Sequence, residues 1–320
     1  MLSRVANAVY WMFRYLERAQ NTARFLSADF SQYLEDRDNQ GSLWVSLLAV
    51  TGDLVLYRER YAVTTRESVI RFLTVDETYV NSILTCIVQA RENARSIREI
   101  ISSEMWEETN SLYLLAQRYA ESPESDPYQF CKAVIDSCYH VVGLFYSTMN
   151  RGEAWHFGRV GMLLERADKT SRILDVKYFV LLPDPTWVGS PYDNTQWAAL
   201  LKAVSGLEMY RKTYRRITPS DVANFLIFHT TFPRSIHHCV HYAVDSLRAL
   251  SGSPVSLEGL RTDLEEGNVE SVLSGGLHEY LDSLQVRMNR VDQEIFHRFF
   301  SLPTPVSPGG RPADAGQHQG

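Results

Sequence analysis

Apolar residues recur along the first thirty positions of this chain at steps that alternate between four and three. They are Val5, Val9, Met12, Leu16, Ala19, Ala23, Leu26 and Phe30. This spacing places all of these side chains on one stripe of an α-helix, which is typical of the buried seam of a helical bundle. The seam predicts a first helix that runs from about residue 3 to the late thirties.

The helical period continues through the rest of the chain, and no segment shows the sustained period of two that a strand in a hairpin would give. Thr218 followed by Pro219 is a typical helix start, and Asp76 is a second candidate cap. Further helices are expected over residues 42–60, 65–73, 77–101, 104–121, 127–150, 154–182, 194–215, 219–228, 233–250, 256–266 and 268–300. We therefore predict an all-α protein, a multi-helix bundle of long antiparallel helices.

The composition excludes several classes of protein. The formal net charge of −6 and the absence of a basic face argue against a nucleic-acid partner. No run of about 18 apolar residues is present, so we expect no membrane span. Charged residues interrupt the apolar start at positions 14, 17 and 18, which argues against a signal peptide and predicts a cytoplasmic protein. The four cysteines show no metal-binding or redox spacing and fit buried free thiols.

The last residues differ in composition from the rest. Positions 303–320 are rich in proline and glycine and contain almost no large apolar side chains. Such a segment buries too little apolar surface to offset the entropy of ordering, so we predict a helical domain over 1–302 and a disordered tail over 303–320.

One charged phrase occurs twice. Residues 14–26 read RYLERAQNTARFL and residues 162–174 read MLLERADKTSRIL. The thirteen positions align at an offset of 148, and seven of them are identical. This self-similarity predicts an internal duplication with units of about 1–150 and 151–300.

The repeated phrase carries a polar ladder on the helix side away from the seam. In the first copy the ladder is Glu17, Asn21 and Arg24, and in the second it is Glu165, Lys169 and Arg172. Two aromatic residues share this side in the first copy and two glycines in the second, at positions 10 and 13 and at positions 158 and 161. The ladders are either ion pairs that fix the packing of the helices or part of a binding or active site.

Three further arginines are candidates for binding. Arg91 and Arg95 share one face of an expected helix within ARENARSIREIISSEMWEETNSLY. Arg234 lies in an expected first helical turn, where its guanidinium and free backbone N–H groups can share an anion, although a capped surface arginine is the alternative.

The phrases YWMFRYLERAQNTAR, ARENARSIREIISSEMWEETN, LLERADKTSR and FLIFHTTFPRSIHHCV together resemble the Alpha-E family of bacterial helical proteins, named for its α-helical domain and its Glu-Arg motif. The resemblance extends to about residue 303. It assigns Glu17, Arg18, Glu165 and Arg166 to the motif without giving them a role. Members are typically encoded beside, or fused to, an ATP-grasp protein and a transglutaminase-like protein. The resemblance therefore implies a component of a peptide-ligation or peptide-modification system.

Other chemistry has weaker support. Two Glu-x-x-His spacings, Glu153 with His156 and Glu294 with His297, match half of a dimetal ligand set, and His237 with His241 lacks the glutamate of a hydrolytic zinc motif. No phosphate-binding loop, dinucleotide fingerprint or nucleophile elbow is present. We expect no metal and no cofactor.

Two functional hypotheses follow. The first is a non-catalytic binding or accessory protein that contacts an ATP-grasp ligase, a transglutaminase-like protein or a peptide substrate through its Glu-Arg faces. The second is a helical enzyme with a Glu/Arg pocket, or less favourably a dimetal site, for a peptide or amino-acid-like substrate. A purely structural oligomeric bundle is a third class. The candidate site residues are Glu17, Arg18, Asn21, Arg24, Arg91, Arg95, Glu165, Arg166, Arg172 and Arg234.

Overall fold

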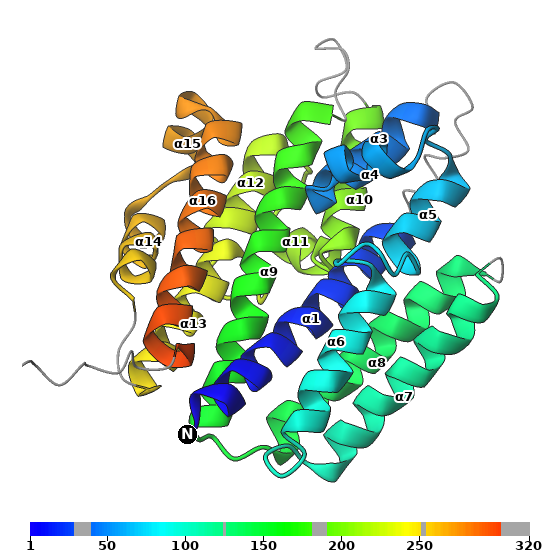
Figure 1. Ribbon diagram of the computed structural model, residues 1–320. Coiled ribbons are helices and arrows are strands. Elements are labelled where there is room, and N and C mark those ends of the chain that lie inside the picture. The colour runs from blue at the N-terminus through cyan, green and yellow to red at the C-terminus, as the bar shows by residue number, and fades with distance from the viewer. Residues whose placement is uncertain (29–39, 124–125, 181–190, 251–253, 302–320) are drawn as a thin grey trace, which may run out of the picture.

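The computed structural model describes residues 1–28, 40–123, 126–180, 191–250 and 254–301. These residues form 15 α-helices and a short π-helical segment and contain no strand, which confirms the all-α prediction (Figure 1). The helices are α1 (Ser3–Ser27), α3 (Gln40–Thr51), α4 (Leu54–Arg60), α5 (Arg66–Thr74), α6 (Ile83–Ser96), α7 (Ser103–Glu121), α8 (Pro127–Thr148), α9 (Glu153–Val180), α10 (Pro191–Ala203), α11 (Leu207–Thr213), α12 (Pro219–Ile227), α13 (Ile236–Leu250), α14 (Val255–Glu266), α15 (Val269–Gly275) and α16 (Leu277–Ile295), followed by η2 (Phe296–Phe300).

The two helices that carry the repeated phrase, α1 and α9, lie side by side at the centre of the molecule (Figure 1). They run in the same direction, since the amino group of Met1 contacts Glu153 at the start of α9. Each is covered by neighbouring helices, so α1 is buried on its polar side as well as along its seam. The central pair is thus a parallel exception among mostly antiparallel neighbours.

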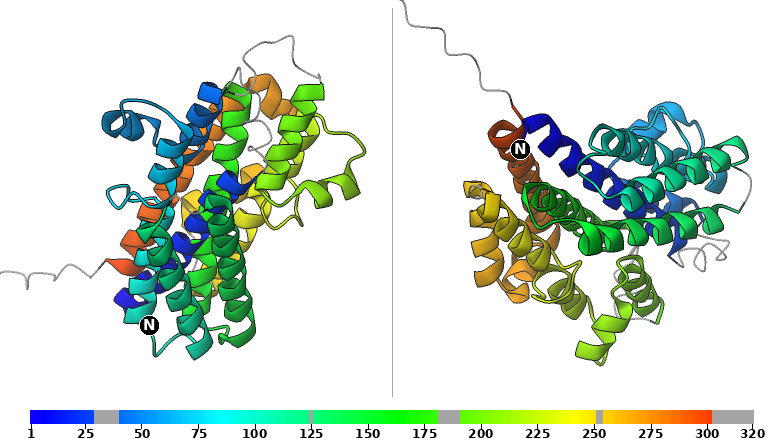
Figure 2. Two further views of the ribbon diagram at one scale, coloured as in Figure 1. Left: turned by 90° about the vertical axis from the view of Figure 1, so that its right-hand side faces the viewer. Right: turned by 90° about the horizontal axis from the view of Figure 1, so that it is seen from below.

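The remaining long helices flank this pair in two similar groups. Helices α6 and α8 pack on α1, and α7 packs on both of them. In the same way, α13 and α16 pack on α9, and α14 packs on both of them. Seen from below, the two groups lie on opposite sides of the central pair (Figure 2). Adjacent helices within each group are antiparallel. Tyr119 at the end of α7 contacts Phe130 at the start of α8, and Ser256 at the start of α14 contacts Glu294 at the end of α16.

An aromatic cluster in and around α4 and α5 has a counterpart in and around α11 and α12 at an offset of 153 residues. Tyr57 stacks on Tyr61 with ring centroids 4.8 Å apart, and Phe72 stacks on Tyr79 at 4.0 Å. The corresponding rings, at positions 210 with 214 and 225 with 232, stack at 4.8 and 4.5 Å. The segments that precede α6 and α13 therefore share a pattern of side-chain contacts.

Several predicted helix boundaries are wrong. Helix α1 ends at Ser27 rather than in the late thirties, and residues 29–39 of the predicted extension lie outside the described residues. Helix α6 begins only after Ser82, which caps it in place of Asp76. Three predicted helices are each divided in two, at positive-φ residues: Gly52, Ser205 and Gly276. By contrast, Thr218 caps α12 as expected.

None of the helices described combines the length and apolar character that a bilayer crossing requires. All four cysteines are buried free thiols. The predicted tail over 303–320 lies outside the described residues.

Candidate functional site

The two Glu-Arg dipeptides of the repeated phrase pair with each other across the α1–α9 contact. Arg18 donates from Nε to one oxygen of Glu165 at 2.7 Å and from Nη2 to the other at 3.0 Å. In return, Arg166 donates to the two oxygens of Glu17 at 3.2 and 2.8 Å. Both pairs are bidentate, which is the strong geometry for a guanidinium and a carboxylate. The motif residues of one helix are thus the partners of those of the other.

The glycines of the second copy allow this close approach. A Cβ atom built on Gly161 would lie 2.4 Å from the backbone oxygen of Tyr10, and one on Gly158 would lie 2.8 Å from the ring of Phe13. Because neither position tolerates a side chain without movement, the glycines fix how closely α9 packs against α1.

Glu165 is the centre of one half of the network and is fully buried. Besides Arg18 it accepts a hydrogen bond from Nε of Arg14 at 2.8 Å. Arg14 also donates to Asp292 of α16 and, at 2.7 Å, to the hydroxyl of Tyr10. The tyrosine hydroxyl donates to the same Asp292 carboxylate at 2.6 Å, so α1, α9 and α16 are connected here.

A cavity of about 330 Å³ opens beside Glu165, and we call it the mixed-charge cavity. Its cations are Arg14, Arg18, Lys169 and Arg172, its carboxylates are Asp53, Asp168 and Asp292, and its uncharged side chains are Trp11, Thr51, Asn81 and Asn289. Gly52 lies at its edge with a φ of +81°, and a Cβ atom there would lie 3.1 Å from Nη1 of Arg172. The turn between α3 and α4 therefore closes over Arg172 only because this residue is a glycine.

Glu17 is the centre of the other half, which is closed. In addition to Arg166, its carboxylate accepts from Arg234 at 2.8 Å and from Asn21 at 3.0 Å. Arg234 also donates to Asn21 and to Gln20, at 3.2 and 3.4 Å. Side chains therefore surround Glu17, which is only 2% exposed.

The charges hold these carboxylates ionised. Burial opposes ionisation of Glu17, but Arg166 and Arg234 outweigh it and keep its pKa well below the usual range. Burial likewise opposes ionisation of Glu165, and Arg18 and Arg14 keep its pKa far below normal. The pKa of Asp168 is also lowered, since its neighbouring cations outweigh its burial.

Three of the predicted site residues lie apart from these pairs. Arg91 and Arg95 both contact Glu92 on the surface of α6, at 2.7 and 2.9 Å, away from the central network. Arg24 is buried, yet none of its three nitrogens has a hydrogen-bond partner among the described residues. The structure thus brings together Glu17, Arg18, Asn21, Glu165, Arg166, Arg172 and Arg234.

The metal hypotheses receive no support from the described residues. They contain no group of three or more His, Cys, Asp and Glu side chains placed to hold a metal ion. Glu153 is paired with the amino terminus, and Glu294 accepts a hydrogen bond from Ser256 at 2.7 Å. The two Glu-x-x-His spacings therefore do not form one ligand set.

The sequence did not identify several residues of the site. Asn81, Asp53 and Asp292 come from segments far apart in the chain, and nothing in their local pattern indicates where they lie. Arg14 and Asp168 carried a weak signal, because each lies within the repeated phrase on the side of the polar ladder.

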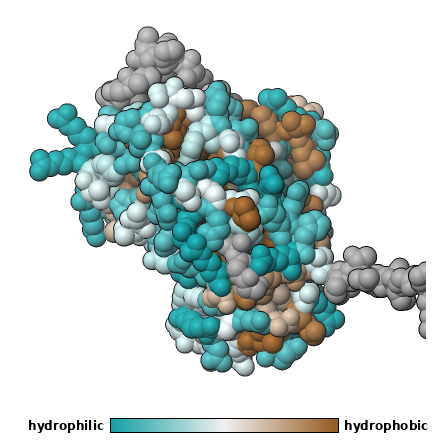
Figure 3. Space-filling view, turned by 90° about the vertical axis from the view of Figure 1, so that its left-hand side faces the viewer, coloured by the Kyte–Doolittle hydropathy of each residue, from teal (hydrophilic) through white to brown (hydrophobic). Residues whose placement is uncertain are grey.

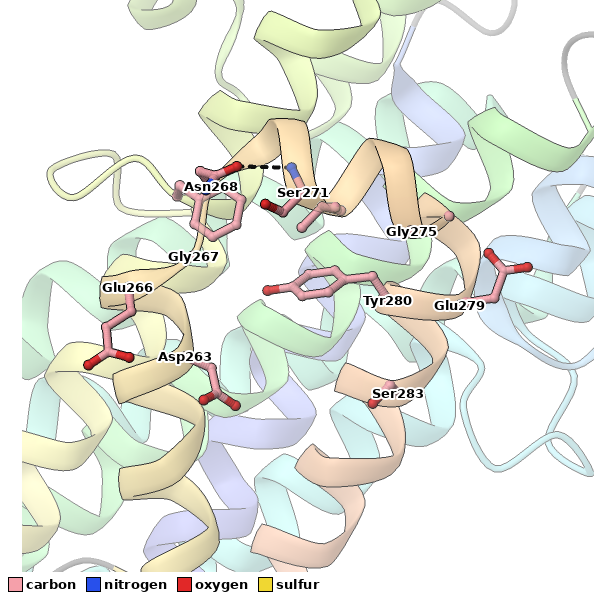
Figure 4. A pocket seen from close by; sticks show the side chains of 12 residues that line it. Asp263, Glu266, Gly267, Asn268, Ser271, Gly275, Glu279, Tyr280 and Ser283 are labelled. Carbon is pink, nitrogen blue, oxygen red and sulfur yellow. Dashed lines mark hydrogen bonds between the residues drawn. The ribbon is translucent and has the colours of Figure 1, made fainter.

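A second cavity of about 480 Å³ lies between α14, α15 and α16. Asp263 and Glu266 border it from α14, and the hydroxyl of Tyr280 points into it from α16 (Figure 4). The face around these helices is largely hydrophilic, with only small separate hydrophobic groups (Figure 3). Asp263 pairs with the partly exposed Arg287 at 2.6 Å, and no buried cation among the described residues lines the cavity, so we assign no function to it.

These features define a class of protein: a helical bundle whose two parallel central helices are joined by reciprocal Glu-Arg pairs. The family model of Alpha-E, described as a predicted alpha-helical domain with a conserved ER motif, matches residues 1–300. The chain belongs to this family, which confirms the resemblance seen in its sequence. No curated protein and no solved structure matches it.

Proposed function

We propose that this protein is a binding component of a bacterial ATP-grasp peptide-ligation or peptide-modification system. Its ligand is a short zwitterionic peptide or an amino-acid-like molecule, held in the mixed-charge cavity. The observation that carries the proposal is the presence of four cations and three carboxylates around one opening of about 330 Å³. A ligand with an ammonium and a carboxylate group matches such a lining, and the volume lies at the lower end of the range for small-molecule sites.

Lys169 and Arg172, the cations of the second ladder, have donors that can bind the carboxylate of a ligand. Arg172 donates from Nε to Asp168 at 2.9 Å, and no hydrogen bond to a described residue occupies its terminal nitrogens. The Nζ atom of Lys169 lies 3.4 Å from Asp168 and 3.7 Å from Glu165, which leaves its donors incompletely used. On the same opening, Asp53 and Asp292 offer acceptors for an ammonium group.

The charge states favour binding over catalysis. A general base works best when its pKa lies near the operating pH. The pKa values of Glu165 and Asp168 are lowered, because neighbouring cations outweigh their burial. Both are therefore weak bases at neutral pH, which supports a binding role rather than the alternative of a Glu/Arg enzyme.

The test is calorimetric titration with a zwitterionic dipeptide, its C-terminally amidated form and its N-acetylated form. We expect only the zwitterion to bind well, and Arg172→Gln to weaken it at least tenfold. The matched control is Arg95→Gln, which removes a surface arginine paired with Glu92. Equal binding of all three forms, or unchanged binding in the Arg172 variant, would contradict the proposal.

The partner is tested separately, by co-purification with the ATP-grasp protein that is expected beside this chain in the genome. We expect a complex that survives size-exclusion chromatography. Migration of the two proteins as separate species, with and without peptide, would contradict the accessory role. It would not contradict ligand binding, which the titration tests.

We also propose that the chain arose by internal duplication. The support is the repeated phrase at an offset of 148 and the repeated aromatic cluster at an offset of 153. The similar packing of α6 on α1 and of α13 on α9 adds to it.

A further inference from the structure

Arg24 in the last turn of α1 is a buried cation whose nitrogens have no hydrogen-bond partner in the described part of the chain. It is 3% exposed, and its Nε, Nη1 and Nη2 atoms make no hydrogen bond to any described residue. A buried donor that loses its partner costs about 1–3 kcal/mol, and more when the group is charged. Three such donors on one guanidinium therefore require an explanation.

The charges of the described residues around Arg24 do not balance. Glu17 is the carboxylate beside it, and Arg166 and Arg234 are further cations. Burial, followed by the charge of Arg24, lowers the pKa of Arg234 to about 9, so that Arg234 is still protonated at neutral pH. Glu17 already accepts two hydrogen bonds from Arg166, one from Arg234 and one from Asn21, so its oxygens are used.

The second copy of the repeated phrase shows which group Arg24 lacks. Arg172 aligns with Arg24, and its Nε donates to Asp168 one helical turn earlier. The position of Asp168 is occupied in the first copy by Gln20, whose side chain donates to the carbonyl of Ile135 at 3.1 Å. The first copy thus keeps the arginine and lacks its carboxylate.

Tyr139 of α8 covers Arg24 from the solvent side. Its ring centroid lies 5.0 Å from Cζ of Arg24, the residue is 48% exposed, and its hydroxyl has a long contact of 3.4 Å with Ser205. Burial opposes ionisation of the Tyr139 hydroxyl, but Arg24, Ser205 and Arg234 together outweigh it and lower its pKa. The group that separates Arg24 from solvent is therefore a half-exposed hydrogen-bond donor.

We propose that Arg24 and Tyr139 form a binding site for a small oxyanion, a carboxylate or a phosphate group. The anion takes the place beside Arg24 that Asp168 takes beside Arg172. A guanidinium presents two parallel N–H donors that match the geometry of both groups, and the tyrosine hydroxyl supplies a further donor. This site is distinct from the mixed-charge cavity and does not depend on the function proposed for it.

Thermal unfolding of the full chain tests the proposal, with chloride replaced by acetate or phosphate at constant ionic strength. An anion bound only by the native state raises the melting temperature, by about 2–4 °C near ten times its dissociation constant. We expect this rise for the wild-type protein and its loss in Arg24→Met. A rise with both anions indicates a site for oxyanions in general, and a rise with phosphate alone restricts it to phosphate groups.

Two further variants decide the origin of the effect. Gln20→Glu restores an internal carboxylate, so we expect it to unfold at a higher temperature and to lose the anion dependence. Arg172→Gln removes the aligned arginine of the mixed-charge cavity and should keep the dependence. A wild-type protein without anion dependence, or undiminished dependence in Arg24→Met, overturns the proposal. If Arg24→Met does not fold, the other two variants decide. The proposal is then overturned if the melting temperature of Gln20→Glu depends on the anion as strongly as that of the wild type, or if that of Arg172→Gln no longer depends on it.

Discussion

Replacement of Glu17 by glutamine tests whether the reciprocal pairs hold the central helices together. The carboxylate of Glu17 accepts four hydrogen bonds, from Arg166 at 3.2 and 2.8 Å, from Arg234 at 2.8 Å and from Asn21 at 3.0 Å. Glutamine preserves the shape of the side chain, but it removes the charge and replaces one acceptor by a donor. The two guanidiniums then face a neutral group inside the protein.

The expected loss of stability follows from the burial of this cluster. Breaking a buried ion pair by removing one partner destabilises a protein by about 3–5 kcal/mol, since the other charge remains buried and unpaired. Typical proteins have a free energy of unfolding of about 5–15 kcal/mol, so this variant should be close to the limit of stable folding.

The assay is urea unfolding of the wild-type protein and of Glu17→Gln, with Glu92→Gln as the matched control. Glu92 also contacts two arginines, but its side chain is 40% exposed, and exposed pairs contribute about 0–1 kcal/mol. We expect a much lower unfolding midpoint for the Glu17 variant and almost none of that change for the control. Equal losses in the two variants would refute the argument from burial.

The same reasoning fixes the pH dependence. Arg166 and Arg234 outweigh the burial of Glu17, so its pKa is lower in the folded protein than in the unfolded chain. A carboxyl with a depressed folded pKa contributes stability that is fully present above its unfolded pKa and is lost as the pH falls through the folded value. The difference in stability between wild type and Glu17→Gln should therefore be constant near neutrality and shrink below about pH 4, near the unfolded pKa of a glutamate.

Three other predictions concern packing, geometry and reactivity. Gly161→Ala should destabilise the protein by about 1–3 kcal/mol, because its Cβ atom would lie 2.4 Å from the backbone of α1, whereas Gly143→Ala meets nothing within 4 Å and should be neutral or stabilising by urea unfolding. Arg18→Lys keeps the charge but loses the bidentate geometry, so by the same assay it should lose about 1–3 kcal/mol. Burial raises the pKa of the thiols of Cys86, Cys131 and Cys239 to about 12. A thiol reagent at pH 8 should therefore label the native protein slowly and the denatured protein at every cysteine.

The sequence predicts the helices well because their apolar seams are local patterns. The seam residues Val9, Met12, Leu16 and Ala19 are all buried in α1. What the pattern does not predict is that the opposite side of α1 is buried too. A helix at the centre of a bundle needs no solvent-facing side, and only its neighbours in the fold reveal that its Glu-Arg ladder is covered.

The candidate site was predictable only in part. Glu17 and Glu165 stand out because the phrase is repeated. Asn81, which contacts Arg18, and Arg234, which contacts Glu17, come instead from loops that precede α6 and α13. These two residues align at the offset of 153, whereas the phrases align at 148. A search at one fixed offset therefore pairs the central helices and misses the loop residues that contact them.

The parallel direction of α1 and α9 explains why the motif occurs on both helices. When two similar helices cross side by side in the same direction, each residue faces a position close to its own counterpart, so a Glu-Arg dipeptide can satisfy its copy on the other helix. Differences between the copies then decide which half is open. Asn81 contacts Arg18 in the half around Glu165, and the aligned residue Arg234 contacts Glu17 in the other half. Because arginine is larger than asparagine, it closes the half around Glu17. The shared motif therefore accounts for the packing of the two helices, and the proposed ligand site lies where the copies differ.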